Sequence, residues 1–162
     1  MITETDLKHL KRCVELAADA LEKGDQPFGS VLVSSEGEVL FEDHNHIAGG
    51  DHTQHPEFNI ARWAGQNMTE EERKAATVYT SGEHCPMCSA AHGLAGLGRI
   101  VYASSSKQLN AWLEEFGVDK KSHVQSLSIE EVLIDPNVDG PVEELAEDVK
   151  ALHRKYYSKT ES

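Results

Sequence analysis

Two short segments constrain this fold most, because in each a proline directly follows a residue that can bind a metal: His55-Pro56-Glu57 and Cys85-Pro86-Met87-Cys88. Proline is favoured at the first position of a helix, where its missing N–H is not needed. The segments therefore predict two helices that begin at Pro56 and Pro86. Residues three apart share a helix face, so Cys85 and Cys88 point the same way. We expect the two helix N-termini to converge on one point.

The residue types at this point favour a catalytic zinc ion, one per chain. One imidazole (His55) and two thiolates (Cys85 and Cys88) are typical zinc ligands, and structural zinc usually takes four protein ligands where catalytic zinc takes three. The spare position can hold a water whose pKa falls toward 7. Glu57 need not be a ligand, so it is the candidate base beside that water. Each motif alone is weaker, since an isolated C-x-x-C is often a redox or structural pair.

With these residues the chain resembles the cytidine deaminase superfamily, whose signature is H-x-E…P-C-x-x-C. The family proline before the first cysteine is here His84, and the ligand spacing is unchanged. The resemblance covers residues 5–105 well and the remainder loosely. It implies a hydrolase that replaces a ring amino group by a carbonyl and releases ammonia. Glu57 would protonate first the ring nitrogen and then the leaving amine.

The resemblance also implies residues that bind the substrate. The family places an asparagine before the histidine motif, where its amide reads the base, and Asn45 occupies that position. Phe28 lies in a Pro-Phe-Gly segment similar to one in bacterial guanine deaminases, where this turn lines the pocket. A phenylalanine here can stack on a flat heterocycle, although core packing is an equally ordinary role.

Pro56 departs from the family, which usually has alanine between the histidine and the glutamate. The backbone N–H of that alanine commonly bonds an acceptor on the base, and proline has no N–H to give. We therefore expect a substrate that lacks an acceptor at that edge, or another donor such as His52, His84 or the Gln54 amide. Spacing alone assigns no metal-binding role to the other histidines near the motifs, His44, His46, His52, His84 and His92.

Hydrophobic periodicity predicts the order α-β-β-α-β-α-β for residues 5–103. We expect a first helix at 5–24 and strands at 30–34, 39–41, 76–80 and 99–103. Further helices are expected at 107–116 and 142–157, and a fifth strand at 124–129. Strands that alternate with helices in this way predict a three-layer α/β/α sandwich with a mixed, roughly five-stranded sheet. Residues 1–162 are expected to form a single domain.

Composition limits the partners of the chain. With 28 acidic and 15 basic residues the formal net charge is −13, whereas proteins bind nucleic acids mainly through lysine and arginine. Long nucleic acids are therefore poor candidate substrates. The sequence contains neither a signal-peptide pattern nor an apolar stretch long enough for a membrane span. The three cysteines do not form a disulfide framework, so we expect a cytoplasmic protein.

Three functions compete on these observations. The first is deamination of a free amino-substituted base or related heterocycle, guanine-like, cytosine-like or a triazine. The second is tRNA adenosine deamination, because that branch of the family has an identical Cys-Pro-Met-Cys motif. The third is a non-catalytic zinc-stabilised binding module in which His52 or His84 completes a four-ligand site. The resemblance further implies a homodimer and a C-terminal segment, at about 142–159, that can close the active site.

Overall fold

The computed structural model describes residues 1–119 and 122–160, which contain one mixed sheet in the order β2-β1-β3-β4-β5. β1 is antiparallel to both β2 and β3, whereas β3, β4 and β5 are mutually parallel. The mixed five-stranded sheet predicted from the sequence is confirmed. The strands are β1 (Gly29–Val33), β2 (Val39–His44), β3 (Thr77–Gly82), β4 (Arg99–Ser104) and β5 (Val138–Asp139).

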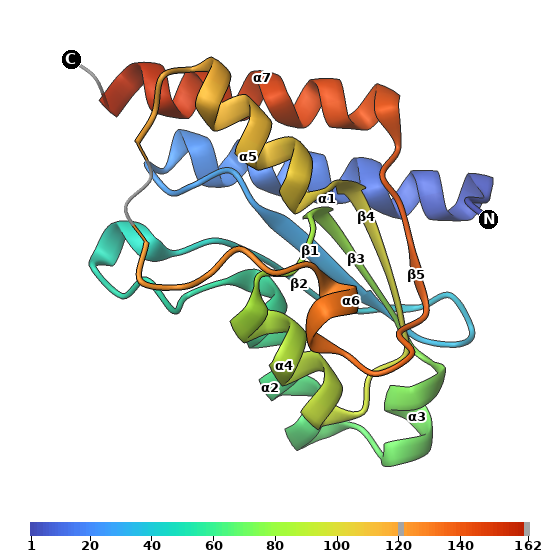
Figure 1. The fold of residues 1–162 in the computed structure, drawn as a ribbon. Coiled ribbons are helices and arrows are strands. Elements are labelled where there is room, and N and C mark those ends of the chain that lie inside the picture. The colour runs from blue at the N-terminus through green and yellow to red at the C-terminus, as the bar shows by residue number, and fades with distance from the viewer. Residues whose placement is uncertain (120–121, 161–162) are drawn as a thin grey trace.

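Helices cover both faces of the sheet, as a three-layer sandwich requires (Figure 1). One layer contains α1 (Glu4–Glu22), α5 (Ser106–Glu115) and α7 (Glu143–Thr160). The other contains α2 (Pro56–Asn67), α3 (Glu70–Ala75), α4 (Pro86–Ala95) and α6 (Ile129–Val132). A short 3₁₀ helix, η1 (Ile47–Gly49), leads from β2 toward α2.

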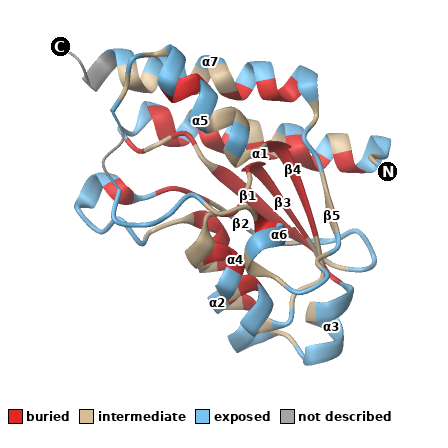
Figure 2. Ribbon diagram, viewed as in Figure 1, coloured by how far each residue is buried: buried red, intermediate tan, exposed pale blue. Residues whose placement is uncertain are grey.

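The alternation of side chains along the central strands explains the two helical layers. In β1, Val31 and Val33 pack into the cluster shared with α1 and α7, whereas Leu32 between them packs against α2. β4 alternates in the same way, with Val101 facing α1 and α7 and Ile100 facing α6. Successive residues of a strand point to opposite faces, so a strand covered on both faces is apolar throughout. Strands β1, β3 and β4 are accordingly buried almost throughout (Figure 2), whereas the outer strands β2 and β5 are partly exposed.

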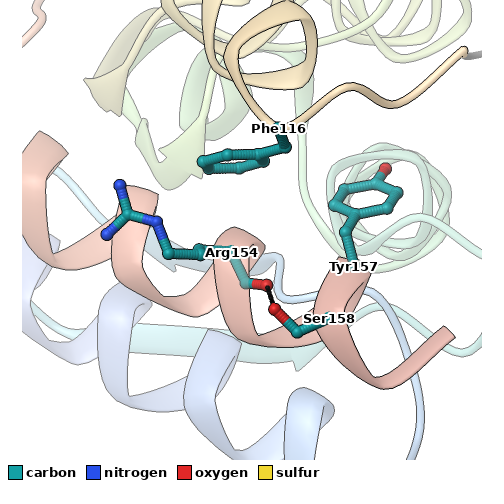
Figure 3. Close-up of a pocket in the computed structure, with 4 residues that line it drawn as sticks. All are labelled: Phe116, Arg154, Tyr157 and Ser158. Carbon is teal, nitrogen blue, oxygen red and sulfur yellow. Dashed lines mark hydrogen bonds between the residues drawn. The ribbon is translucent and has the colours of Figure 1, made fainter. Parts of the chain in front are cut away.

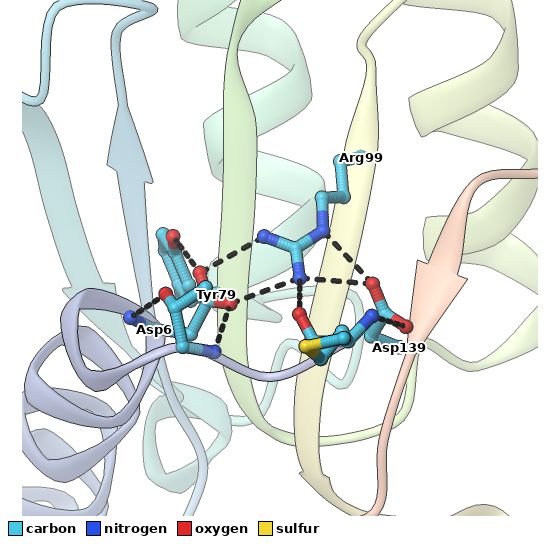
Figure 4. A network of polar contacts seen from close by, with 6 residues as sticks. Asp6, Tyr79, Arg99 and Asp139 are labelled. Atoms are coloured by element: carbon cyan, nitrogen blue, oxygen red, sulfur yellow. Dashed lines mark hydrogen bonds and ion pairs between the residues drawn. The ribbon is translucent and has the colours of Figure 1, made fainter.

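A polar network fixes the start of α1 against the sheet (Figure 4). Arg99 donates to both carboxylate oxygens of Asp6, over 2.9 and 3.0 Å, and to Asp139 over 2.8 and 3.0 Å. The Tyr79 hydroxyl donates to Asp6 over 2.7 Å, and the N-terminal amine of Met1 donates to Asp139. Strands β3, β4 and β5 are thereby joined to the N-terminal helix at the end of the sheet where β3 and β4 begin.

One predicted element is wrong. Residues 124–128 form no strand, and Ile129 begins α6. The fifth strand lies instead at Val138–Asp139, two residues long, where Val138 pairs with Ile100 of β4. Val124 is 58% exposed, so its apolar side chain marks no sheet position. Among the helices of the described residues, none combines the length and apolar character needed to cross a membrane.

Candidate active site

The three predicted metal ligands lie together where α2 and α4 begin. His55 is the N-cap residue of α2 and Cys85 is the N-cap residue of α4, with a proline at the start of each helix as the sequence predicts. Their carbonyls accept the first helical hydrogen bonds, from the amides of Asn59 and Ser89. The two helices pack against each other. This packing brings residues from separate motifs to one point.

The donor atoms fit a zinc ion. His55 Nδ1 lies 3.5 Å from the Sγ atoms of both Cys85 and Cys88, and the two Sγ atoms lie 3.5 Å apart. Tetrahedral zinc with usual bond lengths places nitrogen and sulfur ligands about 3.6 Å apart and two sulfurs about 3.8 Å apart. The observed triangle is close to these values. One imidazole and two thiolates are therefore placed to bind a zinc ion, and three protein ligands would leave one tetrahedral position for water.

The contact between Cys85 and Cys88 shifts the pKa values of the two thiols in opposite directions. The hydrogen bond to Cys88 lowers the pKa of Cys85 to about 4, and the contact with His55 acts in the same direction. The contact with Cys85, together with burial, raises the pKa of Cys88. These opposite shifts describe one proton shared between two sulfur atoms. Zinc binding requires the thiolate form of its cysteine ligands, so the metal would displace that proton.

Glu57 is buried beside the metal ligands, with 5% of its surface exposed. Burial raises the pKa of its carboxyl group, while the positive charge of a protonated His55 has the opposite effect. A carboxylate with a raised pKa can both accept and return a proton near neutral pH, as a general acid–base group must. Glu57 is not part of the group of potential metal ligands formed by His55, Cys85 and Cys88.

Sequence reasoning missed the two hydroxyl groups that hold Glu57. Ser30 Oγ of β1 lies 3.0 Å from Glu57 Oε1, and Thr80 Oγ1 of β3 lies 2.8 Å from the same atom. The two hydroxyls are also 2.9 Å apart, because Ser30 and Thr80 are paired residues in the β1–β3 register. A serine or threonine in a strand carries no local signal of this role. Only the sheet pairing brings the hydroxyls to the carboxylate.

Phe28 and Asn45 are neighbours just before β1 begins, where the backbone N–H of Asn45 donates to the backbone carbonyl of Phe28 over 3.0 Å. The Asn45 side-chain carbonyl accepts from the Ile47 backbone N–H over 3.0 Å, which fixes the orientation of the side chain. The Phe28 ring lies 5.0 Å from the His153 ring of α7. It also covers Gly82, where an added Cβ would lie 3.0 Å from the phenyl ring.

Pro56 and His84 are also placed by the structure. Pro56 is the buried first residue of α2 and lies in the chain between His55 and Glu57. His84 is fully buried, and its ring packs edge-on to that of His92 with 5.5 Å between centroids. Neither nitrogen of the His84 ring has a hydrogen-bond partner among the described residues. A substrate contact of His84 stays a prediction.

The structure does not support a four-ligand zinc site. Within the described part of the chain, neither His52 nor His84 joins the group formed by His55, Cys85 and Cys88. His52 is exposed in the loop before α2. The prediction that one of these histidines completes a structural site is wrong. A three-ligand set is the one expected of catalytic zinc.

A separate cavity of about 140 Å³ lies at the far end of α5 and α7 (Figure 3). Phe116, Arg154, Tyr157 and Ser158 line it, and the Arg154 guanidinium lies 5.4 Å from the centre of the Phe116 ring. None of these four residues is a metal ligand or a predicted substrate contact. The cavity is therefore distinct from the zinc site.

The fold and the site together define a zinc-dependent deaminase, a hydrolase that acts on C–N bonds. Residues 3–104 match the family model described as "Cytidine and deoxycytidylate deaminase zinc-binding region". The chain belongs to this family. The matched segment contains His55, Glu57, Cys85 and Cys88.

Similar proteins within the family have different substrates in their names. The chain is 30% identical over 128 residues to the "Probable cytosine deaminase" of Schizosaccharomyces pombe, covering 79% of this chain and 78% of that protein. It is 27% identical over 110 residues to the "tRNA-specific adenosine deaminase" of Aquifex aeolicus, covering 67% and 72%. The solved guanine deaminase of Nitrosomonas europaea shares the fold, with a TM-score of 0.70 and 18% identity over 98% of this chain and 86% of that one.

Proposed function

We propose that this protein hydrolyses the exocyclic amino group of a free nucleobase or related small heterocycle, guanine-like, cytosine-like or an amino-triazine. The observation that carries the proposal is the buried Glu57 carboxylate, held by Ser30 and Thr80 beside three zinc ligands. The relative named as a cytosine deaminase, matched over more than three quarters of both proteins, supports a small-molecule substrate. The net charge of −13 also favours a small substrate over a polyanion.

The residues of the chain divide the reaction between them. His55, Cys85 and Cys88 would hold the zinc ion, which when bound supplies a Lewis acid that makes water nucleophilic at neutral pH. Glu57 accepts the proton from that water and delivers it to the ring nitrogen next to the carbon under attack. A second proton then passes through Glu57 to the leaving amine. Water and the amine are consumed, and a carbonyl compound and ammonia are produced.

We assign substrate recognition to Asn45, Phe28, Pro56 and His84. Asn45 Oδ1 is occupied by the Ile47 N–H, which leaves the side-chain amide hydrogens as donors to a ring nitrogen or carbonyl of the base. Phe28 offers a flat apolar face for stacking. Pro56 presents no N–H at its edge of the pocket and so selects against bases that need a donor there. His84 lies two residues after β3 and directly before Cys85, and its buried ring would support the side of the pocket next to that ligand.

The C-terminal helix is proposed to form part of the pocket wall. The centre of the His153 ring in α7 lies 5.0 Å from that of Phe28 and 6.2 Å from that of Trp112 in α5. His153, more than a hundred positions after Phe28 in the chain, thus packs edge-on against the proposed stacking ring. This arrangement supports a closing role for residues 142–159 within the same single domain.

tRNA adenosine deamination is the second candidate function. The Aquifex aeolicus relative and the Cys-Pro-Met-Cys motif favour it. The acidic charge of this chain opposes it, because binding of an RNA stem-loop depends on neutralising phosphates.

The deciding experiment measures ammonia release by the zinc-loaded protein against guanine, cytosine, adenine, isoguanine, amino-triazines, their nucleosides and a tRNA anticodon stem-loop. Glu57→Gln is the control, since it keeps the size of the side chain and removes its acid–base function. Turnover of a free base that disappears in the control supports the proposal. Turnover of the stem-loop alone would favour the second candidate, and turnover of neither would contradict both.

A homodimer in the cytoplasm is also proposed. Leu94 of α4 and Ile134 after α6 are 90% and 94% exposed. They belong to neighbouring segments, because the residues directly before them, Gly93 and Leu133, are in close contact. Two large apolar side chains on adjacent elements favour burial against a second copy. Sedimentation of the wild type and of Leu94→Glu would test the assembly. None of Cys13, Cys85 and Cys88 forms a disulfide, which favours a reducing compartment, and cell fractionation would test this.

A further inference from the structure

A second group of potential metal ligands lies where β2 ends and β1 begins. Asp25 precedes β1, His44 is the last residue of β2, and His46 is the N-cap residue of η1. One ligand atom from each of the three lies within 4.8 Å of the others, and the two imidazole rings are 4.4 Å apart between centroids. Asp25 and His44 are buried, whereas the His46 side chain is 47% exposed. The three potential ligands are therefore gathered at one point that has an open side.

Each histidine is oriented by a partner that leaves one ring nitrogen available. His44 Nδ1 lies 2.8 Å from the Asn45 carbonyl, and His46 Nε2 lies 2.8 Å from the Asp43 carboxylate. Both partners can only accept, so these nitrogens carry the hydrogens and the opposite nitrogens keep their lone pairs when the rings are neutral. Metal-binding histidines are held in this way by carbonyl or carboxylate groups.

The outer partners are themselves fixed. Asp43 accepts a second hydrogen bond from the Asn59 side-chain amide over 2.8 Å, which anchors it to α2. Asp25 Oδ1 accepts from the Ala48 backbone N–H over 2.8 Å, which joins the residue to η1. Ligand carboxylates in metal sites are usually hydrogen-bonded in the same manner. The three side chains are thus held by Asp43, Asn45 and Ala48, and Asp43 is itself held by α2.

A cationic group already contacts this cluster. Lys23 Nζ lies 3.2 Å from His44 Nε2, and because His44 Nδ1 is the donor nitrogen, Nε2 must be the acceptor. Lys23 is exposed, so its ammonium can move into solvent without leaving a buried charge. A lone pair directed at an ammonium group can instead bind a metal cation once the lysine withdraws.

We propose that Asp25, His44 and His46 form a second metal site, separate from the zinc site of His55, Cys85 and Cys88. Two imidazoles and one carboxylate favour divalent transition ions such as Zn²⁺, Co²⁺ or Ni²⁺ over Mg²⁺ and Ca²⁺, which prefer oxygen ligands only. A bound ion would join the end of β2 and η1 to the loop between α1 and β1. Lys23 competes with the ion for His44.

The test is a Co²⁺ titration of the full chain carrying Cys85→Ser and Cys88→Ser, which removes both thiolates. One equivalent of Co²⁺ should bind and show d–d absorption without sulfur-to-cobalt charge transfer. Adding His46→Ala should weaken binding by at least about tenfold, because a site of this kind depends on each ligand and its orientation. Adding His52→Ala, an exposed histidine in the adjacent loop, should leave binding unchanged. Adding Lys23→Ala should strengthen it.

Absence of Co²⁺ binding to the double cysteine variant, or equal losses in the two histidine variants, would overturn the proposal. If the double variant does not fold, elemental analysis of otherwise unmodified protein equilibrated with Zn²⁺ replaces the titration. Two zinc ions per chain are then expected for the wild type and for His52→Ala, and one for His46→Ala. One zinc ion in all three proteins would equally overturn the proposal.

Discussion

Arg99 Nη1 of β4 lies 2.9 Å from Asp6 Oδ1 of α1, so an ion pair joins the first helix to the start of β4. Asp6 is buried with 3% of its surface exposed, and its carboxylate also accepts from Tyr79 and from the Thr3 backbone N–H. Burial alone would raise the pKa of Asp6, but the hydrogen bonds from Arg99, Thr3 and Tyr79 outweigh it and hold the pKa well below its usual range.

This ion pair predicts a particular loss of stability in acid. Because the pKa of Asp6 is lower in the folded than in the unfolded protein, its contribution is complete above about pH 4 and declines as pH falls further. Asp6→Asn should lower the free energy of unfolding by about 3–5 kcal/mol at pH 7, since Arg99 loses a buried partner. That difference should shrink between pH 4 and pH 2. Urea unfolding across this range measures it.

Asp19→Asn is the matched control for this prediction, because Asp19 is an exposed aspartate on the same helix. It should change the free energy of unfolding by less than about 0.5 kcal/mol. A difference between Asp6→Asn and the wild type that stays constant down to pH 2 would contradict the role given to the Asp6 carboxylate.

Gly29→Ala should destabilise the fold through a steric clash. A Cβ at this position would overlap the Cys13 carbonyl and the Leu16 side chain of α1, which shows how closely the helix approaches the start of β1. Backbone cannot move aside as a flexible side chain can. We therefore expect the free energy of unfolding, measured with urea, to fall by about 1–3 kcal/mol. Gly49→Ala, where an added Cβ meets nothing within 4 Å, should be near neutral. Equal effects of the two substitutions would contradict this account.

Thr80→Val should lower turnover without removing zinc. The change keeps the shape of the side chain and removes the hydroxyl that lies 2.8 Å from Glu57 Oε1. Glu57 would then be less well positioned, and we expect kcat to fall by about 10-fold to 100-fold with KM little altered. Thr77→Val at the start of the same strand is the control. An unchanged kcat in zinc-replete Thr80→Val protein would show that this hydroxyl does not position Glu57.

Removal of zinc should abolish activity and leave the fold in place. Three hydrophobic clusters extend through both helical layers and do not depend on the metal ligands. A chelator should therefore eliminate ammonia release while the far-ultraviolet circular dichroism spectrum keeps its helical signal. Re-addition of Zn²⁺ should restore activity. Unfolding on chelation would instead indicate that the zinc site is required for folding.

The sequence predicted the elements that have a local signal. Short apolar runs on either side of a glycine-containing turn identified β1 and β2, and a proline after each ligand identified the first residues of α2 and α4. β5 had no such signal, because two residues cannot show a period and the strand is defined by its pairing with β4. The apolar residues of 124–129 imitated a strand, although Val124 is exposed and Ile129 packs within α6 against Ile100.

The candidate site likewise contains residues with a local sequence signal and residues without one. His55, Glu57, Cys85 and Cys88 were identifiable because ligand spacing on a helix is a local property. Ser30 and Thr80, and the meeting of Asp25 with His44 and His46, depend on which strands are neighbours and on how loops pack. These relationships arise from tertiary structure, so no window of the sequence contains them.

The Ser30 hydroxyl reaches Glu57 only when β1 and β3 pair in the register that sets Ser30 opposite Thr80. A shift of β1 by one residue would turn the Ser30 hydroxyl to the opposite face and bring an apolar neighbour to Glu57. Such a misaligned chain would keep the metal ligands, which belong to α2 and α4 and not to β1, but would lose the Ser30–Glu57 contact. Turnover per bound zinc would therefore distinguish correctly registered molecules from misregistered ones in a refolded preparation, where metal content alone would not.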